Sequence, residues 1–511
     1  METFLPAFVA LPLLAGFTCL LIERAAPDAT PWVSVGSMLG LLAFAAFAVA
    51  NGDVAVTFAG GWGLRGVGQD AFVVGIALVL DGLSRLFLLM VAVVGTAASV
   101  YALRYLEPEA GRPLFHVLFN LLVAGMNGAL LAGDLFNLYV FVEVASVASY
   151  GLVAYRAGGT EVEAAFKYLV LGTLASTAIL LATAVLYAAT GYLNMADLSA
   201  AIAGGKVPRV PLLFASGLFV MGFGTKTAAM PFHAWLPDAH PSAPAPISAM
   251  LSGLLIKTLG IYALVRVFSV VVGIDDHLRT ILTVLGCLSM WGGVLLAQAQ
   301  DDLKRILAFH SVSQMGYVLV ALALDTWLGV AAALFHAMNH ALFKSALFLS
   351  SGSLERLTGT RRLSDMGGMF QRAPATSVGL VGACLSISGI PPFNGFWSKL
   401  LILIALVSAG QVLVAVVAAG AALMTLVTFV KVQRKALFGA LPARLAGAGE
   451  VPASMYLPVL ALVALCLLSG LLWPAGVDGM IGAAASAVRA PAGERPAASV
   501  YEATVHGEQA R

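Results

Sequence analysis

Charged residues are scarce in this sequence. They make up 11% of its 511 residues, whereas soluble proteins carry roughly a quarter. Hydrophobic residues account for 60%, and the mean hydropathy is +0.94. So few charges cannot cover a water-exposed surface of this size, which excludes a soluble enzyme. The net charge of +2, without a basic cluster interleaved with aromatic residues, gives no sign of a nucleic-acid partner.

Cysteine is also rare, and the cysteines lack the spacing of a ligand set. Cys19, Cys287, Cys384 and Cys466 lie singly in apolar runs, without a CxxC pair. Such cysteines usually pack as small apolar side chains, so we expect no metal site and no disulfide. The N-terminus lacks the basic region of a signal peptide because it opens with Glu2.

Long apolar runs fill the rest of the chain. A membrane-crossing helix needs about 20 consecutive apolar residues. Segments of this kind lie at 3–22, 31–50, 81–103, 114–132, 134–155, 164–189, 211–232, 244–268, 278–298, 303–322, 327–352, 375–408, 410–431 and 454–473. We therefore predict an all-α polytopic membrane protein with about 14 transmembrane helices.

Two stretches between these runs predict elements outside the bilayer. The stretch 51–80 is Gly-rich at Ala59–Gly63 and then becomes a short extended run at Phe72–Leu80. This pattern predicts an external hairpin, with Asp81 capping the next helix. Leu193–Ala203 predicts a second short amphipathic element.

Lysine and arginine are unevenly distributed between the two sides. Cytoplasmic loops are enriched in these residues. One side holds Arg24, Arg104, Arg112, Arg156, Lys304, Arg305, Arg356, Arg361, Arg362, Arg372, Lys431, Arg434, Lys435 and Arg444. The other side holds Arg65, Arg85, Lys206, Arg209, Arg266 and Arg279, with a few more in the tail. This asymmetry predicts that both termini lie outside the cytoplasm.

A few ionisable residues fall inside the apolar spans, where a charge costs at least about 2.5–3.5 kcal/mol. They are Lys167, Lys226, Lys257, Lys344, Lys399 and Glu143. Each therefore needs a partner or a hydrated cavity. A structural ion pair and snorkelling to the interface are the simpler interpretations, and Lys167, one turn into its helix, suits snorkelling. Lys226, Lys257 and Lys399 lie further from the span ends, which favours a functional role.

Two of these lysines lie beside helix-breaking sequence. Lys226 falls within Gly222–Pro231, and Lys399 follows Gly389–Gly395, which contains two prolines. Proline removes an intrahelical hydrogen bond and glycine loosens the turn. Interrupted membrane helices are tolerated where they line a hydrated cavity, and they mark ion sites in transporters. Their recurrence in both halves fits inverted repeats.

Histidines extend the row of ionisable groups. His336, His340 and Lys344 are four residues apart and share one helix face. Imidazole exchanges protons near neutral pH, which suits a relay. A bis-histidine haem is an alternative, although its ligands usually come from two helices; further candidates are His116, His233, His240 and His310. A stand-alone solute transporter is a second alternative, but it would place aromatic and amide groups around a cavity.

Several sequence blocks together resemble a known family. They are Gly133–Glu143, Ala165–Tyr168, Gly191–Asp197, Lys226–His240, Pro244–Ser248, His336–Lys344 and Gly389–Lys399. They are similar to the antiporter-like membrane subunits. This family comprises proton-pumping subunits of respiratory complex I, subunits of Mrp-type sodium/proton antiporters and counterparts in membrane-bound hydrogenases. The resemblance covers residues 70 to 435.

The resemblance implies a domain organisation. It places helices 1–3 and the hairpin at 1–113, a first inverted repeat of helices 4–8 at 114–268, and a second of helices 9–13 at 278–431, about five helices each. Helices 7 and 12 would be broken. Residues 432–511 would form helix 14 and a C-terminal tail, which we expect to be partly disordered after Trp473.

The resemblance also implies roles for the ionisable residues. Glu143 would pair with Lys226 and modulate its proton affinity, with Lys167 as a further modulator. Lys257, His336, His340 and Lys344 would carry protons along the membrane midplane, and Lys399 would exchange them with the opposite side. Charges about 4 Å apart attract by roughly 4 kcal/mol at an effective dielectric near 20, enough to decide which group holds a proton.

The resemblance is nearest to the Mrp-type sodium/proton antiporter component called D, through Lys257, Lys399 and the run Leu138–Glu143. The chain also ends without the long lateral helix of the distal complex I subunit. We therefore expect a proton-translocating subunit, with a complex I-like or hydrogenase subunit as the alternative. It would need no cofactor of its own, and only those alternatives would make it part of an oxidoreductase. Its partners would be other membrane subunits, protons, Na+ in an antiporter, and the lipid of a prokaryotic cell (inner) membrane.

Overall fold

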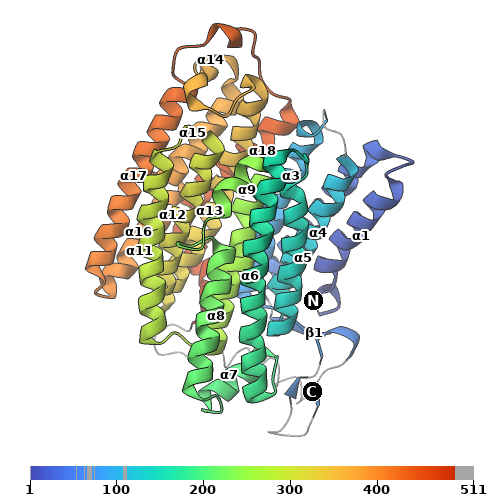
Figure 1. Cartoon of the computed structure of the whole chain (residues 1–511), viewed down its shortest axis with the longest axis vertical. Coiled ribbons are helices and arrows are strands. Elements are labelled where there is room, and N and C mark those ends of the chain that lie inside the picture. The colour runs from blue at the N-terminus through green and yellow to red at the C-terminus, as the bar shows by residue number, and fades with distance from the viewer. Residues whose placement is uncertain are drawn as a thin grey trace.

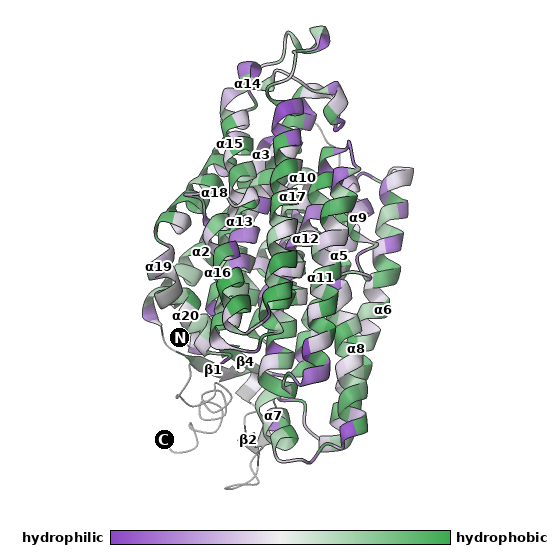
Figure 2. Cartoon of the chain, turned by 90° about the vertical axis from the view of Figure 1, so that its left-hand side faces the viewer, coloured by the Kyte–Doolittle hydropathy of each residue, from purple (hydrophilic) through white to green (hydrophobic). Residues whose placement is uncertain are grey.

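The protein is a bundle of long helices standing side by side (Figure 1). The computed structural model describes residues 2–52, 54–61, 64–65, 72–73, 75–107 and 112–489. In these residues, 12 helices are long and apolar enough to cross a membrane. Apolar side chains cover the outside of the bundle, and Figure 2 shows hydrophobic ribbon along the helices. For example, Leu413 is 77% exposed and Leu423 66%. Exposed apolar faces of this extent suit lipid, which confirms the predicted all-α membrane class.

The first half of the chain contributes helices up to residue 272. They are α1 (Ala7–Ile22), α2 (Thr30–Asn51), α3 (Gly82–Tyr105), α4 (Arg112–Leu131), α5 (Leu135–Val153), α6 (Gly159–Thr190), α7 (Met195–Ala203), α8 (Arg209–Thr227), α9 (Leu236–Ser242), α10 (Ala245–Met250), and two π-helical stretches, η5 (Leu251–Tyr262) and η6 (Val265–Val272). Short 3-10 turns are η1 (Glu2–Phe4), η2 (Pro27–Ala29) and η3 (Ala59–Gly61).

The second half begins at residue 276. Its helices are α11 (Asp276–Gln298), α12 (Leu303–Leu322), α13 (Trp327–Thr358), α14 (Met369–Arg372), α15 (Pro374–Ser388), α16 (Asn394–Ser408), α17 (Val412–Ala436), α18 (Ala453–Leu471), α19 (Trp473–Gly476), the π-helical η9 (Val477–Ile481) and α20 (Gly482–Ser486). The 3-10 turns η7 (Leu363–Asp365) and η8 (Ala443–Leu445) lie in loops.

The 12 helices do not include every helix that lies within the bundle. The 32-residue α13 is outside that set, as are α15 and α16, which have 15 residues each. Helix α13 carries the histidines and Lys344, which lower its hydropathy. The count of about 14, the inverted repeats and the domain boundaries derived from them therefore stay predictions.

The predicted hairpin is present at one end of the bundle. Strands β1 (Ala55–Phe58) and β4 (Ala77–Leu80) pair antiparallel, with Ala55 opposite Leu80, and β2 (Leu64–Arg65) pairs with β3 (Phe72–Val73). Trp62 and Gly63 of the Gly-rich run lie outside the described residues. Asp81 caps α3 as predicted, because its Oδ1 accepts a hydrogen bond from the Ser84 amide at 2.9 Å. Helix α7 confirms the expected short element and lies at the same end (Figure 1).

Both Gly/Pro-rich segments interrupt helices where the sequence predicts. Helix α8 ends at Thr227, before Pro231 and the short α9. Helices α15 and α16 are separated by residues 389–393, which begin with Gly389 at a φ of +76°. A left-handed glycine ends a helix at no steric penalty, and the prolines that follow cannot continue it.

The first part of the tail after Trp473 is helical. Helices α19, η9 and α20 continue along the bundle as far as Ser486, so the expected partial disorder does not begin directly after Trp473. The Trp473 ring stacks on Trp397 with centroids 5.0 Å apart, and the Trp327 indole donates to Ser486 Oγ at 3.0 Å. Aromatic anchors and small residues that pack closely against α3 order this segment despite its composition. Residues 490–511 lie outside the described part of the chain.

Candidate functional site

The Glu143 and Lys226 side chains meet inside the bundle. Glu143 lies on α5 and Lys226 in the last turn of α8, and Lys226 Nζ is 3.8 Å from Glu143 Oε1. The lysine also donates a 2.8 Å hydrogen bond to Ser146 Oγ, one turn from Glu143. The lysine side chain is 4% exposed and the glutamate 27%. The structure thus brings together the two residues that the resemblance pairs, with the lysine buried and the glutamate partly exposed.

Apolar and aromatic groups surround the Lys226 head. Tyr168, Trp235, Leu255 and Leu259 line a narrow gap beside it. The Tyr168 and Trp235 rings stack at 4.2 Å, and the Trp235 indole donates to Thr225 O at 2.9 Å. Because these groups keep water from the ammonium, the electrostatic influence of Glu143 is stronger here than it would be in water.

The central row of ionisable residues is fully buried. Lys257, His336, His340 and Lys344 each have 0% exposure. Lys257 lies in the π-helical η5 and donates to Ser252 O; π-helical turns are frequent at functional sites. Lys344 donates to Leu307 O on α12. The row therefore joins η5 to α13, and Lys344 links it to α12.

The histidines of the row have unsatisfied nitrogens. Within the described residues, neither His340 nitrogen has a hydrogen-bond partner, and His336 uses only Nδ1, which lies 3.0 Å from Ser398 Oγ. Buried polar groups normally find a partner or an ordered water. These nitrogens are therefore suited to exchange protons through water.

Lys399 lies at the end of the row, beside the interruption between α15 and α16. It is 6% exposed, donates to Ile387 O at 2.6 Å, and has its Nζ 5.6 Å from the Tyr317 ring centroid. The carbonyl is free to accept because the helix ends here and leaves its last carbonyls without helical partners. The helix break therefore supplies the acceptor for this lysine.

An amide cluster that the sequence analysis did not identify holds this break in place. Asn394 Nδ2 donates to Asn339 Oδ1 at 2.9 Å, and Asn339 Nδ2 donates to Asn394 O at 3.1 Å. Asn394 also bonds Ser386 and Ser469, at 2.6 and 3.0 Å. The cluster joins α13, α15, α16 and α18. Its only sequence signal is that Asn394 lies within the Gly/Pro-rich segment.

Lys167 has a different setting from the other candidates. Its side chain is 47% exposed and pairs with Glu163 at 2.8 Å and Asp238 at 3.2 Å. Lys167 and Glu163 lie in the first turns of α6 and Asp238 lies on α9, and the exposed position of Lys167 matches the snorkelling interpretation. Any effect of Lys167 on Lys226 would act over a distance, so its modulating role stays a prediction.

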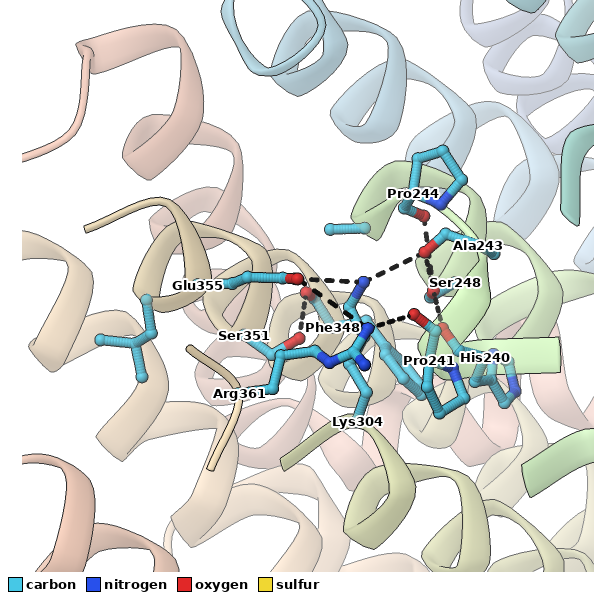
Figure 3. A network of polar contacts seen from close by, with 12 residues as sticks. His240, Pro241, Ala243, Pro244, Ser248, Lys304, Phe348, Ser351, Glu355 and Arg361 are labelled. Carbon is cyan, nitrogen blue, oxygen red and sulfur yellow. Dashed lines mark hydrogen bonds and ion pairs between the residues drawn. The ribbon is translucent and has the colours of Figure 1, made fainter. Parts of the chain in front are cut away.

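A polar network at the loop ends of α12 and α13 was also missed (Figure 3). Lys304, counted from the sequence among the basic residues in or beside the loops of one side, is 0% exposed and lies 3.3 Å from Glu355 Oε2. Arg361 Nη1 donates to Pro241 O at 2.6 Å. Helix α13 continues to Thr358, beyond the predicted span end at 352, and so Glu355 lies in its last turn, beside Lys304.

A second acidic residue, Asp134, lies at the N-terminus of α5. Asp134 accepts a hydrogen bond from the Asn137 amide at 2.6 Å and so caps the helix. The Asp134 side chain is buried there, since the residue is only 8% exposed. Glu143 lies nine residues further along, about 13 Å at the helical rise.

Comparison with known proteins shows which family this chain resembles. Residues 132–425 match the family described as NADH:quinone oxidoreductase/Mrp antiporter, TM, and residues 67–116 match NADH-Ubiquinone oxidoreductase (complex I), chain 5 N-terminus. The N component of NADH-quinone oxidoreductase from Desulforudis audaxviator is 36% identical over 90% of this chain and 94% of its own length. The D component of the Na(+)/H(+) antiporter from Alkalihalophilus pseudofirmus is 34% identical over 78% of this chain and 80% of its own.

A solved structure has the same fold along the whole chain. A chain of the Mrp complex from Dietzia sp. DQ12-45-1b superposes with a TM-score of 0.87 at 31% identity, covering 99% of both chains. The predicted resemblance is therefore confirmed. This chain belongs to the NADH:quinone oxidoreductase/Mrp antiporter family of membrane subunits.

Proposed function

We propose that this chain is a proton-translocating subunit of a multi-subunit membrane complex, nearest to the D component of an Mrp-type sodium/proton antiporter. The Glu143–Lys226 contact carries this proposal, because a buried ammonium 3.8 Å from a partly exposed carboxylate can change its protonation when the carboxylate moves. The Na(+)/H(+) antiporter relative and the Mrp complex chain support the assignment.

In the proposed mechanism, Lys226 exchanges a proton with the central row. When Glu143 is close, the ion pair favours the charged lysine; when it moves away, the dry surroundings favour proton release. The proton passes through Lys257, Lys344, His340 and His336, and Lys399 exchanges it with the opposite side. Glu143 tunes this exchange, and Lys167 acts on Lys226 from a distance.

The environment of the complex forms part of the same proposal. Other membrane subunits are its partners, since the similar solved chain comes from an Mrp complex. It resides in the lipid bilayer of a prokaryotic cell (inner) membrane with both termini outside the cytoplasm. Protons are the transported ions, and Na+ joins them if the parent complex is an antiporter.

A second candidate is a pumping subunit of an NADH:quinone oxidoreductase. The relative from NADH-quinone oxidoreductase favours it, because that similarity covers 90% of this chain. The two candidates differ in their driving force. Purified complex in vesicles should exchange Na+ for protons without an electron donor if it is an antiporter, whereas the second candidate needs NADH oxidation by other subunits.

The Glu143–Lys226 pair provides the direct test. Glu143→Gln and Lys226→Ala should each lower proton transport in vesicles by about 10²-fold, the usual order of a lost acid–base group, while the complex still assembles on native gels. Glu107→Gln removes an exposed carboxylate that pairs with Arg104 at 2.7 Å and serves as the control. Near-normal transport in either pair variant would refute the proposed role of the pair.

A further inference from the structure

The Lys304–Glu355 pair lies outside the site described above and closely resembles it in chemistry. Lys304 Nζ is 3.3 Å from Glu355 Oε2 and donates to Ala243 O at 3.0 Å (Figure 3). The lysine side chain is 0% exposed and the glutamate 23%. A buried lysine beside a partly exposed glutamate therefore occurs twice in the described part of the chain.

Glu355 shares a helix face with the central row. It follows Lys344 by eleven residues on α13, which is about three turns and 16 Å along the axis. Residues at this spacing lie on the same side of a helix. Ser351 lies between them on that side, and His340 and His336 continue the face in the other direction. One face of α13 therefore carries polar groups from its loop end to the neighbourhood of Lys399.

Phe348 and His240 separate Glu355 from Lys344. Lys344 Nζ is 5.7 Å from the Phe348 ring centroid, and the His240 ring lies 4.6 Å from that of Phe348. His240 is 0% exposed, and within the described residues neither of its ring nitrogens has a hydrogen-bond partner. Burial and the charges of Lys344, Lys257 and Lys304 lower the pKa of His240, so a proton that reaches its imidazole leaves it readily. Its imidazole is therefore placed to receive a proton from one side and pass it to the other.

The polar network around Lys304 and Glu355 adjoins a polar cavity through Arg361. This cavity of about 240 Å³ is lined by charged side chains, among them Lys167, Asp238, Asp302, Arg305 and Arg361. Lys167 and Arg305 are 47% and 43% exposed, so the cavity reaches the surface. Arg361 links it to the pair, since its Nε donates to Asp302 Oδ2 at 3.1 Å and its Nη1 lies 3.9 Å from Glu355 Oε1.

We propose that Glu355 is the proton-accepting residue of an access route that leads from this cavity to Lys344. The inference rests on the proposed function, because it supplies the proton path with an opening at the loop end. A proton from cavity water binds the Glu355 carboxylate, which weakens its ion pairs with Lys304 and Arg361. The new O–H bond breaks when the proton passes, through water, to a His240 nitrogen. Phe348 closes the route between transfers.

A double variant separates this role from a structural one. Glu355→Gln alone should reduce proton transport in vesicles by about 10²-fold. However, it also leaves Lys304 buried without its partner, which destabilises proteins. The double variant Lys304→Met with Glu355→Gln removes both charges. The two side chains that replace them are neutral and can still pack against each other. We expect this double variant to assemble on native gels and still to transport at the reduced rate, while Glu355→Asp retains most of the activity.

The controls distinguish this inference from the proposed function. Glu107→Gln, at the same end of the bundle, should transport like the wild type. If the wild type transports protons and Glu143→Gln blocks them, the proposed function stands whatever the Glu355 variants do. A double variant that regains wild-type transport, or that fails to assemble, would assign the pair a structural role and overturn the access route.

Discussion

At the scale of single residues, Lys399 differs from Lys226 in its partners. The described contacts of Lys399 are Ile387 O and the Tyr317 ring, and no carboxylate lies among them. Desolvation by the protein and the neighbouring helices, rather than a fixed counter-ion, would therefore set its proton affinity. Lys226, in contrast, has a carboxylate partner within 4 Å.

Replacement of Lys399 by arginine tests whether it carries protons. Arginine keeps the positive charge but does not release a proton at any usable pH. Lys399→Arg should therefore reduce pH-gradient-driven transport as severely as Lys399→Ala, by about 10²-fold. Transport assays in vesicles, with assembly checked on native gels, measure both. An active arginine variant beside a poorly assembled alanine variant would show that the residue is only a structural charge.

At the scale of elements, the break between α15 and α16 depends on very close backbone contacts. A Cβ added at Gly395 would lie 1.8 Å from Ser386 O, and one at Gly470 of α18 would lie 2.2 Å from Pro392 O. Real Cβ atoms do not approach so closely, so only glycine allows these helices to pack. The Asn339–Asn394 amide pair then fixes the joint against α13.

Alanine at Gly395 should accordingly disrupt this joint. The substitution forces α16 away from α15, and overpacking of this kind costs about 1–3 kcal/mol or more. We expect a lower thermal unfolding midpoint of the detergent-purified complex and weaker transport, because Ser398 and Lys399 move with α16. Gly36→Ala in α2 is the matched control, since nothing lies within 4 Å of its added Cβ. Equal midpoints for both variants would refute the close-packing argument.

At the scale of the whole molecule, the two ends of the bundle differ in charge. The loop end of α13 carries Arg356 and Arg361, and Arg356 reaches across to donate to Arg104 O. The opposite end carries the hairpin and α7, where β1 also packs against the N-terminal turn η1 (Figure 1). The basic end corresponds to the side that the lysine and arginine distribution assigns to the cytoplasm.

Cysteine labelling measures this orientation. Ser364 is exposed at the basic end, where its hydroxyl donates to Asp301 at 2.7 Å. Ser364→Cys should react with a membrane-impermeant thiol reagent only after the cells are permeabilised. Lys206→Cys, beyond α7, should react in intact cells, and the parent chain with its own cysteines gives the background. The reverse pattern would place the termini in the cytoplasm.

The sequence by itself determined the class of the protein and most of its ionisable candidates. Apolar runs, the scarcity of charge, the four-residue spacing of His336, His340 and Lys344, and the Gly/Pro interruptions are all local signals. They depend on helix periodicity and on the penalty for charge in lipid, so they need no knowledge of the fold. The contact between Glu143 and Lys226 was expected from the family resemblance rather than from spacing.

Only the tertiary structure decided which distant residues are partners. The hydrogen bond between Asn339 and Asn394 joins residues 55 positions apart, and Lys304 on α12 forms an ion pair with Glu355 on α13. Both Lys304 and Glu355 lie near helix ends, where sequence reasoning places charges in solvent. In the structure, neighbouring helices bury Lys304. Helix α13 extends about two turns beyond the predicted end, which places Glu355 beside this lysine. Burial depends on what packs against a residue, and in a helical bundle that information lies in another part of the chain.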